Sequence, residues 1–413
     1  MIFRSIKTFA SLLLAALLTV SCGGDSAPPP TGLTARAGET NVTLSWDMVA
    51  GVEYWVFSAP TAVAPTAVDS NMIKWIGILG GDTVVKASSP HVVSGLANGL
   101  SYSFSVNGRT DGGPGGTGAK PVTATPVLAG SNWTAGPVDV LAGKNLRSLA
   151  RGTVYLAAGQ SGAMASSADG VSWTAISAAT GRNLNGATFY GNYKVVGDAG
   201  VALTSTDAVA WTMQSTGTTE NLYAIASNNA NLNVAVGAKG TIISSPDGAS
   251  WSAVKSVTSR DLYGVAYGAA GWVAVGAAGT VLQSADGVNW TAVVSGTNAD
   301  LRGVAAGSAA AAAGSTLSTL MFVATGASGT VLSSSDGTNW TAQSLPGKAD
   351  LNAVCYGTQF VAVGSGGAIF TSTDGLGWTA AATSKAGGAM YAVARGTLAY
   401  AAVGDAGANL SSR

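Results

Sequence analysis

Short apolar runs alternate with turn residues from residue 127 to the end of the chain, in a pattern that repeats about every 40 residues. One copy, residues 261–293, contains the runs DLYGVAYG, WVAVGAAG, TVLQSADG and VNWTAV in that order. Runs of this length that are rich in β-branched and aromatic residues, and that are bounded by Gly, Asp and Ser, are typical of strands. Each copy therefore predicts four short strands joined by turns.

One tryptophan marks each copy. The seven tryptophans are spaced by 40, 38, 40, 39, 50 and 38 residues, at Trp133, Trp173, Trp211, Trp251, Trp290, Trp340 and Trp378. A repeat of this size with four strands is one blade of a β-propeller. The fifth spacing is longer because residues 308–319 (SAAAAAGSTLST) widen the hairpin between the first two strands of that copy. We interpret the alanine run as a loop insertion.

The last blade needs strands from both ends of this repeat region. After Trp378 the sequence supplies three strands, MYAVARG, LAYAAVG and ANLSS, and no fourth. A lone fourth strand surrounds Trp133, and Gly130 precedes that tryptophan by three residues, as a glycine does in five other copies. Pairing residues 130–136 with the C-terminal strands completes a seventh blade and removes the open sheet edges. The predicted fold class is all-β, and residues 127–413 form a seven-bladed propeller whose last blade joins N-terminal and C-terminal strands.

Residues 33–126 predict a separate all-β domain, with strand-like runs at 42–46 (VTLSW), 54–58 (YWVFS) and 101–109 (SYSFSVNGR). In residues 96–102 (LANGLSY) a Leu precedes Tyr102 by six positions, and a Gly follows that Leu by three. This spacing resembles the tyrosine corner of fibronectin type III domains, in which a tyrosine hydroxyl bonds to the backbone.

The fibronectin type III resemblance implies a β-sandwich with Trp46 and Tyr102 in its core, because Trp46 stands where that family keeps a core tryptophan. Asn98 occupies a position where the family often has Pro, and the stretch 59–89 is longer than usual. We therefore expect an inserted loop or hairpin between residues 59 and 89. His91 is expected in an exposed loop or at a strand edge.

The N-terminal residues have the layout of a secretory signal peptide, since Arg4 and Lys7 precede an apolar run over residues 9–20. This run is too short for a membrane-spanning helix, which takes about 20 residues. The next residues, LTVSCG (18–23), resemble the lipobox of bacterial lipoproteins, with Thr19 in place of the usual Leu.

The lipobox resemblance implies a signal peptide over residues 1–21 and lipidation of Cys22. Residues 22–32 then form a polar, proline-rich tether to the membrane. Gly23 rather than Asp follows the cysteine, which implies the outer membrane of the bacterial cell envelope. Ordinary secretion, with cleavage near Ser21, is the alternative.

Composition narrows the possible chemistry. Charged residues make up 10% of the chain, and 20 basic residues balance 20 acidic ones, so no basic surface is available for nucleic acid. His91 is the only histidine, which disfavours a His-rich metal site or a Ser-His-Asp relay. With Cys22 acylated, Cys355 is the only thiol left, so no internal disulfide can form. We expect no metal, no cofactor and no nucleic-acid partner.

The turn before each tryptophan carries the motif Ser/Thr-x-Asp-Gly-x-x-Trp. Its carboxylates are Asp169, Asp207, Asp247, Asp286, Asp336 and Asp374, and Asp207 differs in being followed by Ala208. The motif resembles the Asp-box, or BNR repeat, of sialidases and of photosystem II assembly-factor-like propellers, over roughly residues 130–413 and with one residue fewer between Asp and Trp. We assign these aspartates a structural role, because Asp accepts hydrogen bonds from turn amides, Gly takes a positive φ and Trp fills the gap between blades.

An enzymatic function has to be weighed because sialidases share the Asp-box. That resemblance implies an arginine triad, a tyrosine nucleophile assisted by a glutamate, and an aspartate acid/base. Past residue 130 the only glutamate is Glu220, and the aspartates largely occupy repeated turn or loop positions, so two opposed free carboxylates are hard to find. Sialidases are also six-bladed, against seven blades here. We expect no catalytic residues and no enzymatic activity.

A candidate binding site comes from the one first-strand position that varies between blades. It directly follows the leading Leu or Met and is occupied by Arg147, Asn185, Tyr223, Tyr263, Arg302, Asn352 and Tyr391. These residues are expected near one mouth of the central channel, on the face that also carries Gln160, Asp198, Lys239 and Asp405 in the turns between second and third strands. Arg and Tyr often anchor interfaces. The alternative is that the set merely solvates the channel mouth.

Two further repeated positions are interpreted as structural. Six residues precede the leading Leu and are expected to cap their loops as Asx turns: Asn145, Asn183, Asn221, Asp261, Asp300 and Asp350. Cys355 aligns with small first-strand residues of the other blades, which predicts a packed thiol without a reactive role.

These observations predict a non-catalytic, lipid-anchored envelope protein that binds a protein partner, or scaffolds assembly, through its propeller face. The photosystem-factor resemblance implies protein recognition. A glycan-binding or carbohydrate-active, sialidase-like surface protein is the alternative. The lack of paired free carboxylates favours the first hypothesis.

Overall fold

The computed structural model describes residues 26–64, 81–111, 113, 115–136, 143–228, 232–309, 319–383, 388–397 and 399–412. The predicted signal peptide (residues 1–21) and the predicted lipidation site Cys22 lie outside these residues. The chain divides into two compact units, Met1–Leu128 and Ala129–Arg413. Within the described residues, no helix has the length and apolar character needed to cross a membrane.

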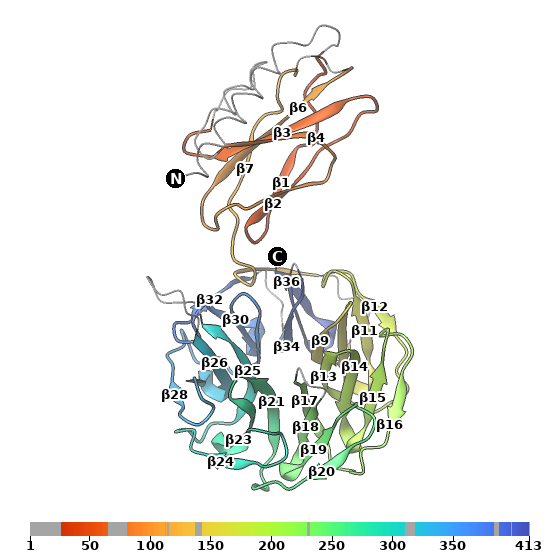
Figure 1. The fold of residues 1–413 in the computed structure, drawn as a ribbon, viewed down its shortest axis with the longest axis vertical. Helices are drawn as coiled ribbons and strands as arrows, with labels where there is room; N and C mark the ends of the chain where they lie inside the picture. The colour runs from red at the N-terminus through yellow and green to blue at the C-terminus, as the bar shows by residue number, and fades with distance from the viewer. Residues whose placement is uncertain are drawn as a thin grey trace. The chain divides into compact units, whose positions relative to one another are not determined.

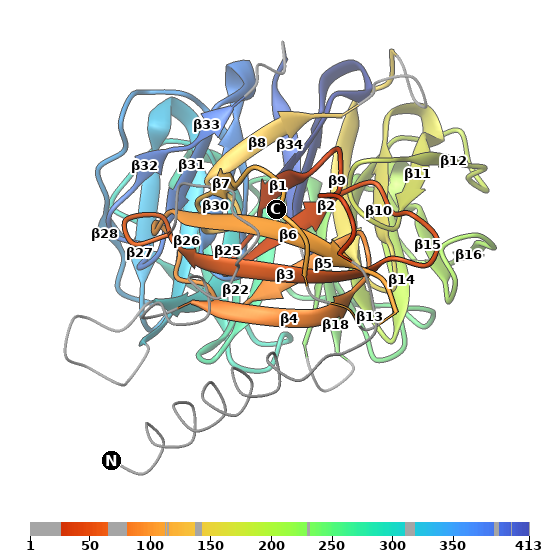
Figure 2. The ribbon, with the colours of Figure 1, turned by 90° about the horizontal axis from the view of Figure 1, so that it is seen from above.

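The first unit is a sandwich of two antiparallel sheets. One sheet has the order β1-β2-β5 and the other β4-β3-β6-β7; β4, β3 and β6 run side by side in Figure 2. The strands are β1 (Thr34–Ala37), β2 (Asn41–Ser45), β3 (Glu53–Pro60), β4 (Asp82–Ala87), β5 (His91–Ser94), β6 (Tyr102–Arg109) and β7 (Val122–Ala124). Side chains from both sheets form one core, including Val42, Leu44, Val56 and Phe104.

Particular residues of the first unit lie where the sequence analysis expects them. Trp46 and Tyr102 are buried, and the Tyr102 hydroxyl accepts a hydrogen bond of 3.0 Å from the Ala97 N–H. Strand β4 lies within the long stretch 59–89, of which residues 65–80 are outside the described part. His91 begins β5, opposite Leu44. Membership of the fibronectin type III family stays a prediction.

The proposed tether is partly docked on this unit. Ser26 forms an antiparallel bridge with Arg109, and Ala27 is only 5% exposed. The Ala27 carbonyl lies against Gly116, where a Cβ would stand 2.0 Å from its oxygen. Residues 26–30 therefore continue the folded unit, because apolar contact and backbone pairing hold a segment that composition alone marks as flexible.

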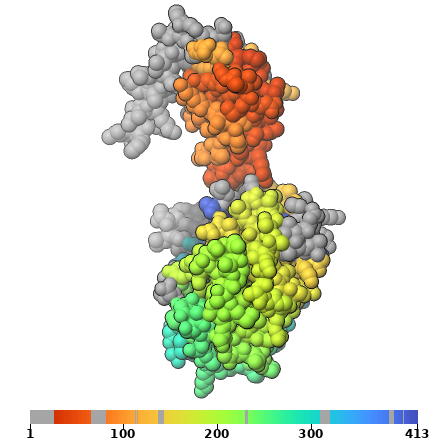
Figure 3. All heavy atoms as spheres, turned by 90° about the vertical axis from the view of Figure 1, so that its right-hand side faces the viewer, coloured from red at the N-terminus to blue at the C-terminus, as the bar shows by residue number. Residues whose placement is uncertain are grey.

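The second unit is a propeller of seven sheets, which confirms the predicted fold class. Six blades have four antiparallel strands each. Their innermost strands lie toward the middle of the unit and their outermost strands at its periphery (Figure 1). Figure 3 shows the outer side of the first blades, yellow to green, as a continuous surface from blade to blade.

From the centre outward, the strands are β9 (Leu146–Arg151), β10 (Tyr155–Gly159), β11 (Met164–Ser167) and β12 (Thr174–Ile176) in blade one; β13 (Leu184–Tyr190), β14 (Asn192–Gly197), β15 (Ala202–Ser205) and β16 (Thr212–Gln214) in blade two; β17 (Leu222–Ser227), β18 (Asn233–Gly237), β19 (Ile242–Ser245) and β20 (Ser252–Val254) in blade three; β21 (Leu262–Gly268), β22 (Gly271–Gly276), β23 (Val281–Ser284) and β24 (Thr291–Val293) in blade four; β25 (Leu301–Ala309), β26 (Thr319–Gly326), β27 (Val331–Ser334) and β28 (Thr341–Ala342) in blade five; and β29 (Leu351–Tyr356), β30 (Phe360–Gly364), β31 (Ile369–Ser372) and β32 (Thr379–Ala380) in blade six.

Blade seven is closed by the two ends of the unit, as predicted. Strand β8 (Asn132–Ala135) pairs antiparallel with β36 (Asn409–Ser412), outside β35 (Tyr400–Gly404) and β34 (Met390–Arg395). A short strand that the repeat does not predict, β33 (Ala382–Thr383), pairs parallel with β8. It extends the seventh sheet to five strands because the chain leaving blade six runs alongside β8.

The propeller core lies between blades. Most second strands carry a fully buried aromatic residue in their first half, as at Tyr155, Tyr193, Trp272, Phe322, Phe360 and Tyr400. Three tyrosines of this set also bond to the neighbouring blade. The hydroxyls of Tyr155, Tyr193 and Tyr400 donate to the carbonyls of Ala399, Val154 and Gln359, at 2.6, 2.8 and 2.9 Å. Each buried hydroxyl therefore has a partner only when the adjacent blade is in place.

The widened hairpin of blade five is built by longer strands. The pairing of β25 and β26 continues to Ser308 opposite Leu320 and Ala309 opposite Thr319. The predicted insertion therefore lies at the expected place, and residues 310–318 are outside the described part of the chain.

Candidate functional site

Each Asp-box carboxylate closes its own turn. Oδ1 of Asp286 accepts hydrogen bonds from the Val288 and Asn289 N–H groups at 2.9 and 2.8 Å and from the Ser284 hydroxyl at 3.0 Å. The same contacts recur at Asp169, Asp207, Asp247, Asp336 and Asp374. Hydrogen bonds from the backbone N–H groups of Ser250 and Ala249 lower the pKa of Asp247 to about 2. A carboxylate held in this way is a turn acceptor and not a proton donor.

The second turn of each blade is tight and carries residues of positive φ. A short 3-10 turn joins the second and third strands of each blade. These turns are η2 (Gln160–Gly162), η3 (Asp198–Gly200), η4 (Ala238–Gly240), η5 (Ala277–Gly279), η6 (Ala327–Gly329), η7 (Ser365–Gly367) and η8 (Asp405–Gly407). Their central residues have φ between 49° and 62°, a region that costs a non-glycine residue energy. Only η7 has glycine at this centre, Gly366.

The six Asn and Asp residues before the leading Leu bond across the blade boundary and do not cap their own loops. Each side-chain oxygen accepts from the N–H at the centre of the preceding blade's 3-10 turn, as from Lys239 to Asp261 and from Ala278 to Asp300, both at 2.8 Å. The other donor–acceptor pairs are Ala406–Asn145, Ser161–Asn183, Ala199–Asn221 and Ser328–Asp350. We call these six side chains the inter-blade acceptors. The expectation of local Asx turns did not foresee this, because the donor is 22 residues away in five pairs and 261 in the sixth.

The seven varied residues lie around one mouth of the channel, and we call them the polar ring. They are joined sideways to one another and to the 3-10 turns. Arg147 Nη1 donates to Asn185 Oδ1 at 2.9 Å, and Asn185 Nδ2 donates to Asp198 Oδ1 at 2.7 Å. Arg302 Nη1 donates to Asp350 Oδ2 and Asn352 Oδ1, both at 3.0 Å.

The tyrosines of the polar ring also contact neighbouring side chains. The rings of Tyr223 and Tyr263 pack with their centroids 5.7 Å apart, and the Tyr391 hydroxyl donates to Asp405 Oδ1 at 2.8 Å. Sequence reasoning treated the arginines as free to meet a partner. The structure gives each of them a neighbour, because adjacent first strands bring successive ring positions within side-chain reach.

Beneath the polar ring the channel is apolar. Its lining residue lies two positions further along each first strand, and the set, which we call the apolar floor, is Leu149, Ala187, Ile225, Val265, Val304, Val354 and Val393. Together with six of the seven ring residues, all but Arg147, the floor encloses an open pocket of about 190 Å³. The pocket is open, and most of its apolar floor residues are buried beneath the polar groups that converge on it. Convergent polar groups in a concave site are typical of ligand pockets. The sequence analysis did not predict the apolar floor, because its residues cannot be distinguished from other apolar residues of the strands.

The tyrosines at the mouth lie in an electrostatic field dominated by carboxylates. Burial raises the pKa of both Tyr223 and Tyr263, and the Asp261 carboxylate raises each further. For Tyr391 the hydrogen bond to Asp405 is the largest cause of its raised pKa. Two nearby basic residues are already paired with carboxylates. Lys239 forms an ion pair with Glu220 at 2.9 Å, and Arg302 forms one with Asp350 at 3.0 Å.

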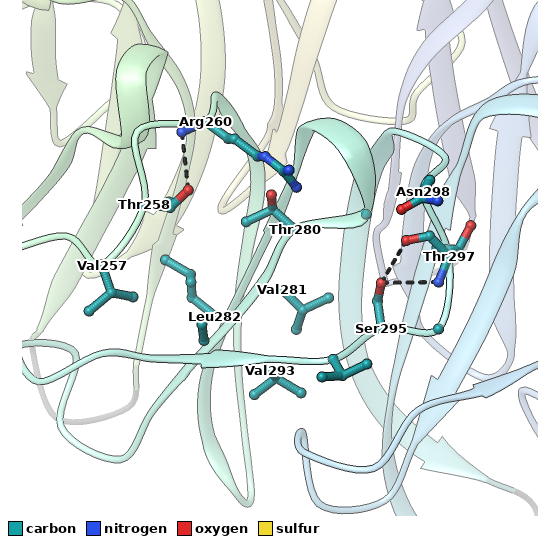
Figure 4. Close-up of a pocket in the computed structure, with 14 residues that line it drawn as sticks. Val257, Thr258, Arg260, Thr280, Val281, Leu282, Val293, Ser295, Thr297 and Asn298 are labelled. Carbon is teal, nitrogen blue, oxygen red and sulfur yellow. Dashed lines mark hydrogen bonds between the residues drawn. The ribbon is translucent and has the colours of Figure 1, made fainter.

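A larger hollow of about 440 Å³ lies at the rim of blade four, between the loops that lead into β21 and β25. Figure 4 shows Val257, Val281, Leu282 and Val293 lining it, with Arg260 reaching over Thr280. The Arg260 guanidinium donates to the Ala278 carbonyl at 3.1 Å. Sequence reasoning missed this hollow because its walls come from two connecting loops and from strands β23 and β24, none of which has distinctive residues.

Two further groups of the propeller, a partly buried thiol and a buried lysine, have shifted pKa values. Burial raises the pKa of the Cys355 thiol to about 12, so the thiol stays protonated and unreactive at neutral pH. Lys194 is 3% exposed in β14, and its Nζ donates to the Tyr190 carbonyl at 3.0 Å. Burial lowers the pKa of Lys194. Within the described residues, no three His, Cys, Asp or Glu side chains gather as metal ligands would.

No family model and no curated protein matches the chain. Solved structures match its propeller at low sequence identity. The structure described as YCF48 bound to D1 peptide is 16% identical with a TM-score of 0.53, covering 68% of this chain and 94% of that one. A streptogramin B lyase is 8% identical with a TM-score of 0.58, covering 68% and 97%. The WD40 propeller domain of Doa1 is 9% identical with a TM-score of 0.51, covering 68% and 96%. These likenesses establish a β-propeller; they include a lyase, so the fold does not decide whether the chain is catalytic.

Proposed function

We propose that this protein is a non-catalytic envelope lipoprotein whose propeller binds a protein partner at the channel mouth. The observation that carries the proposal is the polar ring, seven hydrogen-bonding side chains at one repeated position, six of which line a pocket of about 190 Å³. Neighbouring positions of the repeats are nearly uniform, so blade packing does not require this variety. A propeller of similar fold has been solved with a bound peptide, which supports protein as the ligand class.

The described carboxylates of the propeller support a non-catalytic function, because they are engaged in structural contacts. The Asp-box oxygens accept turn N–H groups, and the inter-blade acceptors accept N–H groups of neighbouring blades. Glu220 is held by Lys239. A hydrolase needs two carboxyl groups opposed across a substrate, one of them protonated, and the described residues give none of these groups that environment.

The test compares two double variants. Arg302→Ala with Tyr263→Ala removes a guanidinium and an aromatic ring from the mouth. Arg36→Ala with Tyr267→Ala is the matched control, because Arg36 is an exposed residue of the first unit and Tyr267 lies at the other end of the strand that carries Tyr263.

The partner is first recovered by crosslinking in intact cells, and its affinity for each purified variant is then measured. We expect the ring variant to bind it about 30-fold more weakly, since interface anchors contribute about 2 kcal/mol or more. Its stability should fall by about 1 kcal/mol or less, because the lost ion pair is half exposed. Unchanged affinity of the ring variant, or a glycan-array signal that depends on the ring, would contradict the proposal.

A further inference from the structure

The channel mouth has two features that together define the chemistry of a ligand, and the inference drawn from them rests on the proposed function. The first is depth. The apolar floor lies two strand positions beyond the polar ring, so a group that enters this open pocket comes into contact with Leu, Ile and Val side chains. A cavity of about 190 Å³ holds one side chain of leucine or methionine size, and burial of such a group is favourable.

The second feature is a pair of carboxylates, Asp261 and Asp300, on the side of blades four and five. Beyond the effect of burial, both carboxylates raise the pKa of Tyr263, and Asp261 also raises that of Tyr223, so their charges act on two tyrosines of the polar ring. Within the described residues, the ion pairs of this region are Glu220–Lys239 and Asp350–Arg302, and neither pair includes Asp261 or Asp300.

Both carboxylates keep an oxygen for a ligand. Oδ1 of Asp261 and of Asp300 accepts the N–H of a neighbouring turn. Within the described part of the chain, Oδ2 of each makes no hydrogen bond. Tyr223 and Tyr263 line the pocket, whereas Asp261 and Asp300 lie outside its lining, and an aromatic face attracts a cation.

We propose that the partner presents a polypeptide segment that inserts one apolar side chain onto the floor and places an adjacent lysine or arginine against Tyr223, Tyr263 and the Asp261 and Asp300 carboxylates. The raised pKa values of Tyr223 and Tyr263, to which burial contributes most and Asp261 adds, agree with an anionic environment that a cation would relieve.

The chain itself offers a clean variant for the charge. Asn145, Asn183 and Asn221 perform in blades one to three the same acceptor role that Asp261 and Asp300 perform in blades four and five. Asp261→Asn with Asp300→Asn therefore keeps the inter-blade hydrogen bonds and removes two charges. The control variant is Asp82→Asn with Asp111→Asn, which removes two negative charges from the first unit and leaves the channel mouth unchanged.

The experiment selects random heptapeptides displayed on phage against the purified protein, and measures the recovered peptides by fluorescence polarisation. We expect sequences with Leu, Ile or Met next to Lys or Arg. These peptides should bind the Asp261→Asn, Asp300→Asn variant at least tenfold more weakly, with a reduced salt dependence and an unchanged melting temperature, and should bind the control variant as they bind the natural chain. Val304→Thr should weaken the same peptides at least fivefold by making the floor polar.

Each outcome bears on the inference. Recovered peptides without a basic residue, or equal binding to the Asp261→Asn, Asp300→Asn variant, would overturn it. If such peptides still need Arg302 and Tyr263, the protein-binding proposal stands and only the ligand chemistry is wrong. If no peptide is recovered, and the partner crosslinked in cells binds the ring variant normally, both proposals fail.

Discussion

At the scale of single residues, the propeller uses side-chain oxygens to hold turns that the backbone alone would not favour. The centres of six 3-10 turns have positive φ without being glycine, and the N–H of each is met by an inter-blade acceptor. The seventh turn has Gly366 at its centre and needs no such help; Ala389 stands where its acceptor would be. The strain and its compensation therefore occur together in the sequence.

Lys194 is the residue whose burial has the clearest energetic consequence. It stands where the other blades have Leu156, Val234 or Val273, inside an apolar strand. Burial lowers its pKa from the ordinary 10.5, so between the lowered value and 10.5 the unfolded chain binds more protons than the native one. The cost to stability is therefore fully present below the lowered pKa of Lys194 and is relieved as the pH rises from that value to 10.5.

Lys194→Met should raise the melting temperature at pH 7, with a gain of about 1 kcal/mol from replacing a buried charge by an apolar side chain of similar length. The gap between variant and natural chain should narrow from pH 7 to pH 10, as followed by thermal melting monitored by circular dichroism. Lys348→Met, at an exposed position, should show no such trend. A lower melting temperature for Lys194→Met at pH 7 would show that the hydrogen bonds of Nζ outweigh the cost of burial.

At the scale of elements, the seventh blade decides whether the propeller is a closed ring. Strand β8 supplies Trp133, which is 3% exposed and packs against Tyr400 with ring centroids 6.3 Å apart. The Gly130 N–H donates to the Ser412 hydroxyl at 2.8 Å, so the first and last turns of the unit are joined. Without β8, strand β36 would become a bare edge.

Removal of residues 129–136 should therefore destabilise the propeller by roughly 3–5 kcal/mol from the buried tryptophan alone. Urea unfolding of the shortened chain measures this. A chain that lacks residues 23–125 is the control and should keep the cooperative transition of the propeller, since the unit has its own core. Unchanged unfolding of the 129–136 deletion would mean that β8 adds nothing to closure.

At the scale of the whole molecule, two units follow a predicted lipid anchor. Residues 26–30 are packed on the first unit, so any free tether is shorter than composition predicts. Attachment to the membrane would then depend on acyl chains at Cys22, which lies outside the described residues.

Cys22→Ser should abolish acylation and move the protein from the membrane fraction to the soluble fraction, because acyl chains provide the membrane affinity of such a protein. Fractionation with immunoblotting, together with mass spectrometry of the N-terminal peptide, measures both effects. Cys355→Ser is the matched control and should stay with the membrane, since its thiol is packed in blade six. A natural chain without lipid mass, fractionating like the Cys22→Ser variant, would refute the lipoprotein proposal.

The propeller, its seven blades and its closure could all be predicted from the sequence. Those features follow from local patterns, namely strand alternation, Asp-box turns and one Trp in each repeat, so they can be counted along the chain. The position of the polar ring was also readable, because one repeated position varies while its neighbours do not.

The contacts between side chains of different blades could be known only from the tertiary structure. The bonds of Arg302 to Asp350 and Asn352, the bonds of Asp261 and Asp300 to turns 22 residues earlier, and the pairing of β33 with β8 all join blades. The apolar floor and the burial of Lys194 likewise depend on how neighbouring strands enclose space. A repeat pattern fixes each blade, but contacts between blades depend on the angle and distance at which the closed ring holds them, and no local pattern in the sequence records these.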